Sequence, residues 1–173
     1  ALECAKSGKA HIVCENDADC IEKIKALLDY LPDNNLSASP FSGENDDINR
    51  TSEVLNSADT ENLDIRTVIN EISDASSVLE LSKDFAPNVA TALVKLGGES
   101  AAVVAASGEL DIAGCKKASR FVRFADSFNI PVVTITNVTG FKADKNEEDA
   151  NSLASAAELI SAYAEATTAK IDI

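Results

Sequence analysis

The hydrophobic pattern near the start of the chain is that of an amphipathic helix. After Asn16 and Asp17, either of which can cap a helix, apolar residues fall at helical spacing at positions Ile21, Ile24, Leu27, Leu28 and Leu31. Pro32 follows and ends the helix, because proline cannot donate the next backbone hydrogen bond. Ahead of the cap, the residues from Lys9 to Cys14 predict a short strand.

The second half of the chain alternates between strand and helix patterns. The uninterrupted apolar run Ala101–Ala106 is typical of a strand buried on both faces. Gly97 and Gly98 predict a tight turn that joins this run to a strand over residues 88–96. Further strands are expected at 78–81, at 131–136 and from residue 171, with helices at 63–72, 112–128 and 147–166.

The order of these elements predicts an α/β layered fold. From residue 101 onward, strand and helix patterns follow one another through short loops. Such an order gives a parallel sheet with right-handed crossover helices, and the earlier hairpin lies at its edge. Residues 33–62 interrupt the pattern, since they are rich in Asn, Ser, Asp and Glu and contain Pro40 and Gly43. We interpret them as a linker or a long surface loop, which is a natural boundary between two packed regions.

The charge of the chain argues against several kinds of partner. With 15 Lys and Arg against 29 Asp and Glu, the formal net charge is −14. Nucleic acid and anionic membrane surfaces would repel such a chain, and no apolar run is long enough for membrane insertion. The single His11 cannot complete a zinc site of recognisable spacing. Reduced thiols in a cytoplasmic protein are predicted for Cys4, Cys14, Cys20 and Cys115.

Two segments lie where ligands bind in parallel sheets, beyond the carboxyl ends of the strands. They are Ala106–Gly108 and Asn137–Phe141, and we expect the second to begin a polar loop that runs to Asn146. Gly140 permits a close backbone approach, so backbone N–H groups there can face an oxyanion or a polar ligand. The alternative interpretation is an ordinary strand-to-helix turn, which spacing alone favours.

Other chemical candidates are weaker. The helix over 112–128 carries a basic face formed by Lys116, Lys117, Arg120 and Arg123. This face can attract an anionic ligand such as a CoA phosphate, but such a face is more often merely solvated or paired with acidic neighbours. The acidic run Glu147–Asp149 is compatible with a metal, but the helix dipole at a helix start explains it better. A Ser-His-Asp triad would need His11, which lies far from any nucleophile signal.

One long stretch of the chain resembles a known family. The segment Cys115–Thr134, which reads CKKASRFVRFADSFNIPVVT, closely resembles part of the biotin-dependent carboxyltransferase family. Members of that family include propionyl-CoA carboxylase beta chains, the transcarboxylase large subunit and the alpha chains of sodium-pumping methylmalonyl- or glutaconyl-CoA decarboxylases. The likeness continues in further segments at Ser7–His11, Ile24–Asn35, Val78–Leu81, Phe85–Asn88 and Tyr163–Thr167.

The resemblance implies a crotonase-like fold of two related halves, of which this chain holds part. Residues 1–35 would end the half that grips acyl-CoA, residues 36–62 would form the linker, and residues 63–173 would begin the biotin-side half. The implied reaction moves a carboxyl group between carboxybiotin and an acyl-CoA of the propionyl-CoA and methylmalonyl-CoA type. Backbone N–H pairs stabilise its enolate-like states, and this half-reaction needs no metal.

The same resemblance implies several partners. They are an acyl-CoA substrate, biotin held on a biotin carboxyl carrier protein or domain, and further copies in a trimer of dimers or a complementary fragment. Where family members have Asp-Val-Pro-Gly-Phe, this chain has Asn137-Val138-Thr139-Gly140-Phe141. The resemblance therefore assigns biotin-side contacts to Gly140 and Phe141 and leaves the roles of Asn137 and Thr139 open.

The catalytic residues stay unknown at this point, because both glycine-rich oxyanion segments of the family lie outside the chain. We therefore expect a fragment that is inactive alone. It would serve either as a component of the enzyme or as a non-catalytic assembly module. A crotonase-type hydratase or isomerase ranks lower, since those enzymes rely on paired glutamates and on the same outlying loops.

Overall fold

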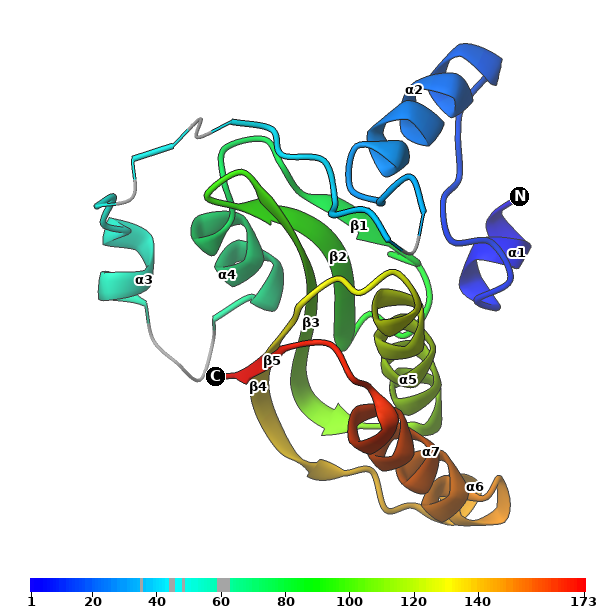
Figure 1. Ribbon diagram of the computed structural model, residues 1–173. Coiled ribbons are helices and arrows are strands. Elements are labelled where there is room, and N and C mark those ends of the chain that lie inside the picture. Colours follow the sequence, from blue (N-terminus) through cyan, green and yellow to red (C-terminus); the bar gives the residue numbers. More distant parts are fainter. Residues whose placement is uncertain (35, 44–45, 48, 59–62) are drawn as a thin grey trace.

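The computed structural model describes residues 1–34, 36–43, 46–47, 49–58 and 63–173. Within these residues, one mixed sheet has five strands in the order β1-β2-β3-β4-β5 (Figure 1). β1, β2 and β3 are antiparallel neighbours, whereas β3, β4 and β5 run parallel. The strands are β1 (Leu79–Leu81), β2 (Val89–Leu96), β3 (Glu99–Leu110), β4 (Val132–Phe141) and β5 (Lys170–Asp172).

Helices cover both faces of this sheet, which confirms the α/β layered architecture. α5 (Ile112–Ser127) and α7 (Ser152–Glu165) lie on one face, and α4 (Ile65–Ile72) lies on the other (Figure 1). The hairpin of β2 and β3 is part of the same sheet, as expected from Gly97 and Gly98. The other described helices are α1 (Leu2–Lys6), α2 (Asp17–Leu28), α3 (Glu53–Ser57) and α6 (Lys145–Asp149).

The two central strands supply side chains to two apolar layers. Leu93 and Val104 belong to the layer beneath α5, whereas Val94 and Val103 belong to the layer beneath α4. Successive side chains of a strand point to opposite faces, so a strand covered on both sides must be apolar at every position. This requirement explains the uninterrupted run Ala101–Ala106.

β4 is longer than its apolar run, so the prediction of a polar loop from Asn137 is wrong for residues 137–141. β3 pairs with β4 as far as Leu110 and Phe141. The ladder satisfies backbone hydrogen bonds there, and side chains such as Thr139 are exposed to water. Polar residues can therefore continue the strand beyond the core.

Two other predicted elements differ from the structure. The helix expected over 147–166 is divided into α6 and α7, because Asn151 between them has a left-handed backbone with φ 69°. The strand expected over Lys9–Cys14 is irregular instead. A backbone hydrogen bond joins it to the end of β1, where Ser82 N–H donates to the His11 carbonyl at 2.7 Å.

The helix predicted after Asn16 forms as α2, and the segment that follows it is joined to the sheet. Asn16 caps α2, since its side chain accepts a hydrogen bond from Asp19 N–H at 3.0 Å. After α2, Tyr30 is buried in the same apolar cluster as Leu93, and its hydroxyl donates to the Ser77 carbonyl. The segment before the linker therefore shares a core with the sheet, while α2 itself has no buried residue.

The turn between β2 and β3 is held by one carboxylate. Asp74 is 8% exposed, and its oxygens accept from Gly97 N–H at 2.9 Å and from Gly98 N–H at 2.7 Å. Both glycines have positive φ, which glycine adopts without steric cost. The turn that begins β3 thus depends on a charged acceptor from the segment after α4.

We predict that Asp74→Ala lowers the free energy of unfolding by about 2–3 kcal/mol, because the buried Gly98 N–H and the part-buried Gly97 N–H lose a charged acceptor. Chemical denaturation followed by circular dichroism measures this change. Asp33→Ala removes an exposed carboxylate as the matched control, and we expect it to stay within about 0.5 kcal/mol of the parent. Equal stability of the two variants would contradict this role for Asp74.

Candidate functional site

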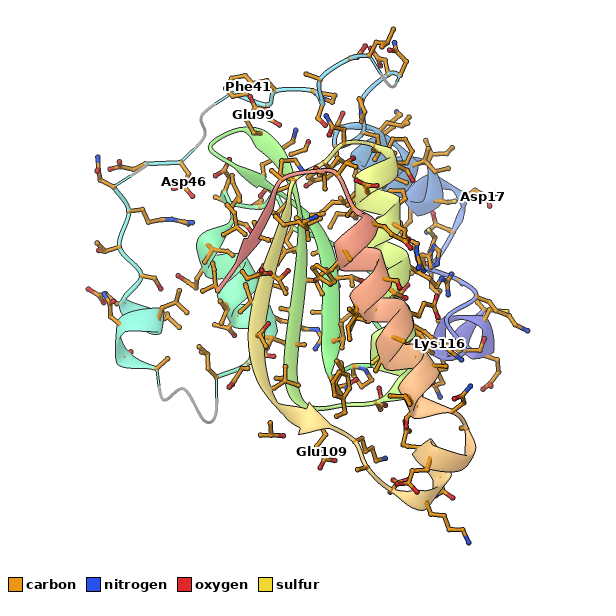
Figure 2. All side chains as sticks on the ribbon, turned by 60° about the horizontal axis from the view of Figure 1, so that its bottom comes forward. Asp17, Phe41, Asp46, Glu99, Glu109 and Lys116 are labelled. Carbon is orange, nitrogen blue, oxygen red and sulfur yellow. The ribbon has the colours of Figure 1, made fainter. Side chains whose placement is uncertain are left out.

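The parallel pairing brings together the two segments that the sequence singled out. In the register of β3 and β4, Ser107 lies opposite Asn137, and Glu109 lies opposite Gly140. A β-bulge between Gly108 and Glu109 shifts the register at this end. Figure 2 shows Glu109 at the end of the sheet opposite to Glu99. The segments are therefore neighbouring strand ends rather than two separate loops.

Gly140 and Phe141 lie on the open surface of this strand end. Gly140 has φ 152°, a conformation that side chains rarely adopt, and a Cβ there would meet no atom within 4 Å. Phe141 is 54% exposed. β5 accompanies β4 only as far as the bond from Thr136 N–H to the Ile173 carbonyl. Beyond it, Val138–Phe141 have β3 on one side and no paired strand on the other within the described residues.

Next to this strand end lies a cleft of about 420 Å³ between the sheet and the helices α5 and α7. Most of its lining is apolar, from β3, β4 and α7. Its polar groups include the Tyr163 and Thr134 hydroxyls, which lie 3.0 Å apart in a hydrogen bond. Burial, followed by the nearby Asp172 carboxylate, raises the pKa of Tyr163, while the bond to Thr134 opposes the shift. The tyrosine is therefore neutral at physiological pH.

The sequence predicts a site at the ends of β3 and β4, but it does not predict this cleft. Gly140 and Phe141 do not line it, whereas the adjacent Val138 does. In the sequence, Thr134 and Tyr163 belong to two segments that resemble the family, and they are 29 positions apart. Their contact depends on how α7 packs on the sheet, which no local pattern indicates.

The basic face expected on α5 is not a single face. Lys117 is 4% exposed, because its ammonium donates to the carbonyls of Phe85 at 2.7 Å and Ala86 at 3.4 Å. Arg123 pairs with Glu158 at 3.0 Å on α7. Lys116 remains exposed. The prediction of four basic residues sharing one solvated surface is thus wrong for Lys117.

The acidic run lies in α6, with Glu147 and Glu148 in its first turn as the helix-start interpretation predicts, and Glu147 has a further role at another helix. Glu147 accepts from Ile112 N–H at 2.9 Å, so its carboxylate serves the start of α5. No group of three or more His, Cys, Asp or Glu side chains suited to a metal occurs among the residues that the structure describes. In the same part of the chain, no helix has the length and apolar character needed to cross a membrane.

The chemistry of the cleft is that of binding rather than of acid–base catalysis. Its walls offer hydroxyls and the Asp172 carboxylate. Cys115 on α5 is buried, and burial followed by Asp111 and Glu147 raises its pKa to about 11. A thiol with such a pKa is protonated at neutral pH and is a poor nucleophile. His11 lies outside the cleft lining.

Comparison with known proteins finds close relatives of this chain in both structure and sequence. A solved structure of transcarboxylase 12S with methylmalonyl-CoA and methylmalonic acid bound matches with a TM-score of 0.94 at 35% identity, over 99% of this chain and 35% of that one. The methylmalonyl-CoA decarboxylase subunit alpha of Veillonella parvula is 38% identical, over 96% of this chain and 35% of that protein. The propionyl-CoA carboxylase beta chain of Cereibacter sphaeroides is 36% identical, over 97% and 35% respectively.

These matches define the fold as crotonase-like, as the sequence resemblance implies. A family model described as "Carboxyl transferase domain" matches residues 2–173, and the chain belongs to that family. The chain spans about a third of the length of the curated relatives that it matches.

A carboxylate on α5 fixes the connection between α7 and β5, and with it one wall of the cleft. Asp126 accepts from Thr167 N–H at 2.6 Å, from Thr168 N–H at 3.0 Å and from the Thr167 hydroxyl at 3.2 Å. The Thr168 N–H, followed by the Thr167 groups, holds the pKa of Asp126 below its usual value, while desolvation opposes them. β5 begins two residues after this clamp, at Lys170.

We predict that the stabilisation from Asp126 is complete above pH 4 and is lost as pH falls through its lowered pKa. The sign follows from linkage, because the unfolded state binds this proton more readily than the folded state. Asp126→Asn should lower the free energy of unfolding by about 1–2 kcal/mol at pH 7 and reduce its fall between pH 4 and pH 2. Denaturation over this pH range measures the difference, and Asp33→Asn should leave the profile of the parent unchanged.

Proposed function

We propose that this chain is a component of a biotin-dependent carboxyltransferase, which moves a carboxyl group between carboxybiotin and an acyl-CoA. The acyl-CoA would be of the propionyl-CoA and methylmalonyl-CoA type, the substrates named in the relatives. The observation that carries the proposal is the match to transcarboxylase 12S, with a TM-score of 0.94 over 99% of this chain. The place of the cleft, at the carboxyl ends of the parallel strands, supports it.

Within that enzyme we assign this chain to the biotin side. Residues 63–173 would belong to the half that receives biotin, residues 1–35 would end the acyl-CoA half, and residues 36–62 would link the two. The assignment is supported by the exposed strand end at Gly140 and Phe141, where backbone groups are accessible. The bicyclic ring of biotin has apolar faces and a polar ureido group, which suits a mostly apolar cleft with hydroxyl groups on its walls.

The remaining parts of the proposal concern partners. Biotin would arrive on a carrier protein or domain, and the enzyme would be an oligomer that works in the cytoplasm. The solved transcarboxylase 12S is described as a hexamer. Because the chain spans 35% of its relatives, we propose that turnover needs regions equivalent to their other parts. A non-catalytic assembly role for the isolated chain is compatible with the same observation.

We predict that biocytin, biotin joined to lysine, binds at the end of β4. Backbone amide shifts in a titration should occur at Gly108, Val138, Gly140 and Phe141. Gly140→Val should weaken binding about tenfold or more, because a valine cannot adopt φ 152° without strain and the strand end must move. Gly43→Val is the matched control, since Gly43 also has positive φ and open space but lies in the linker.

The ligand also has a control. Lipoyl-lysine, which has a similar arm but no ureido ring, should cause no comparable shifts. Shifts confined to other surfaces, or equal weakening by both glycine variants, would argue against the biotin-side assignment.

We also predict that the isolated chain transfers no carboxyl group. Radiolabelled methylmalonyl-CoA incubated with the chain and free biotin should release no label above the protein-free rate, because turnover is proposed to need regions equivalent to the other parts of the relatives. Turnover by the chain alone would refute the claim that it needs further regions. Recovery of activity when the missing regions of a relative are added would support it.

A further inference from the structure

A second cleft, of about 190 Å³, lies between the N-terminal segment and the face of the sheet that α5 covers. His11, Ile12 and Leu27 line it from the N-terminal side. Leu81 and Ser82 line it at the end of β1, and α5 adds a third wall. None of its lining residues lines the cleft beside β4. The function proposed above leaves this second cleft without a role.

Two polar side chains of low overall exposure line this second cleft and have hydrogen-bonding capacity left. Lys117 is 4% exposed; its ammonium has three N–H donors, and the carbonyls of Phe85 and Ala86 take two of them. Ser82 is 9% exposed, and its hydroxyl has no hydrogen-bond partner among the described residues. By contrast, the Thr91 hydroxyl in the same cleft is used, since it donates to the Leu81 carbonyl at 2.9 Å.

The backbone at Ser82 is itself unusual. Ser82 has φ 55°, a left-handed conformation that costs free energy for any residue other than glycine. Its N–H donates to the His11 carbonyl, which joins the two sides of the second cleft. A glycine would fit this backbone better, so folding alone gives no reason for a serine side chain here.

The charges around the second cleft favour an anion. Burial lowers the pKa of Lys117 to about 8, so the ammonium is still mostly protonated at pH 7. Arg120 adds a second cation, which is held in place by the Gly8 carbonyl at 3.3 Å and by His11 Nε2 at 2.9 Å. Burial, followed by the Arg120 guanidinium, lowers the pKa of His11. The imidazole is therefore neutral at pH 7 and can accept the hydrogen bond from Arg120.

The walls of the second cleft restrict the anion to an organic one. Most of them are apolar, from Ile12, Leu27, Leu81, Phe121 and Phe124. A hydrated phosphate gains nothing from such walls. A cavity of about 150 Å³ lined by apolar side chains holds a benzene molecule. The second cleft is therefore large enough for a ring or a short branched chain together with a carboxylate.

We propose that the second cleft is a binding site for a small organic carboxylate with an apolar group about the size of benzene. The carboxylate accepts hydrogen bonds from the Lys117 ammonium and the Ser82 hydroxyl, and the apolar group packs against the two phenylalanines. Because both the N-terminal segment and α5 line the site, a bound carboxylate links the N-terminal segment to α5.

Benzoate is the probe that tests this site on the full 173-residue chain. In a titration followed by backbone amide shifts, we expect saturation, with the largest changes at Ile12, Ser82, Thr91 and Phe121. Benzyl alcohol and benzylamine, which keep the ring but lack the anion, should bind about tenfold or more weakly. Absence of saturation, shifts confined to the cleft beside β4, or equal binding of benzyl alcohol would overturn the proposal.

Two variants with a matched control complete the test. Lys117→Met should weaken benzoate binding about tenfold or more, whereas Lys116→Met, on the exposed side of α5 (Figure 2), should leave it unchanged. Ser82→Gly removes the free hydroxyl and suits the left-handed backbone. It should therefore keep or raise the melting temperature while weakening benzoate about threefold or more. If Lys117→Met does not fold, Ser82→Gly decides, and binding equal to that of the parent overturns the proposal.

Discussion

β3 is paired along most of its length on both sides, and the positions of the other elements follow from this arrangement. β2 pairs with it from Glu99 to Ala106, and β4 pairs with it from Ala102 to Leu110. Its side chains enter both apolar layers, so each helix layer packs against the same strand. α5 starts directly after it, where Asp111 accepts from Gly114 N–H at 2.7 Å. β3 thus forms one wall of the cleft at the carboxyl ends of the parallel strands.

The parts farther from β3 are attached by buried or half-buried charged groups that bind backbone. Lys95 is 4% exposed and donates to the Pro40 carbonyl and to the Ser100 hydroxyl, and its ammonium lies 5.4 Å from the Tyr30 ring centroid. Burial lowers its pKa, and the negative charges of Glu99, Asp29 and Asp74 partly oppose this shift. Lys117 and Asp126 act similarly on the Phe85 turn and on the start of β5. A charge that makes several hydrogen bonds to backbone fixes a segment that has little apolar surface of its own.

The sequence predicts those elements whose burial is complete and misses those that depend on contacts between distant residues. The run Ala101–Ala106 is predicted as a strand buried on both faces, and it is one. The polar end of β4 is a strand only because β3 extends beside it. The burial of Lys117 depends on two carbonyls more than thirty positions away, which no helical pattern can reveal. For the same reason the sequence indicates the strand ends of the candidate site but not its cleft.

The two clefts differ in the chemistry that their side chains allow. The cleft beside β4 has a neutral tyrosine, a threonine and a carboxylate, and no cation lines it. Any negative charge that develops in a ligand there would have to be stabilised by backbone N–H groups, from this strand end or from another part of the enzyme. The second cleft has the reverse arrangement, with a buried ammonium close to carbonyl oxygens and apolar walls. It therefore suits a ligand that already carries its negative charge.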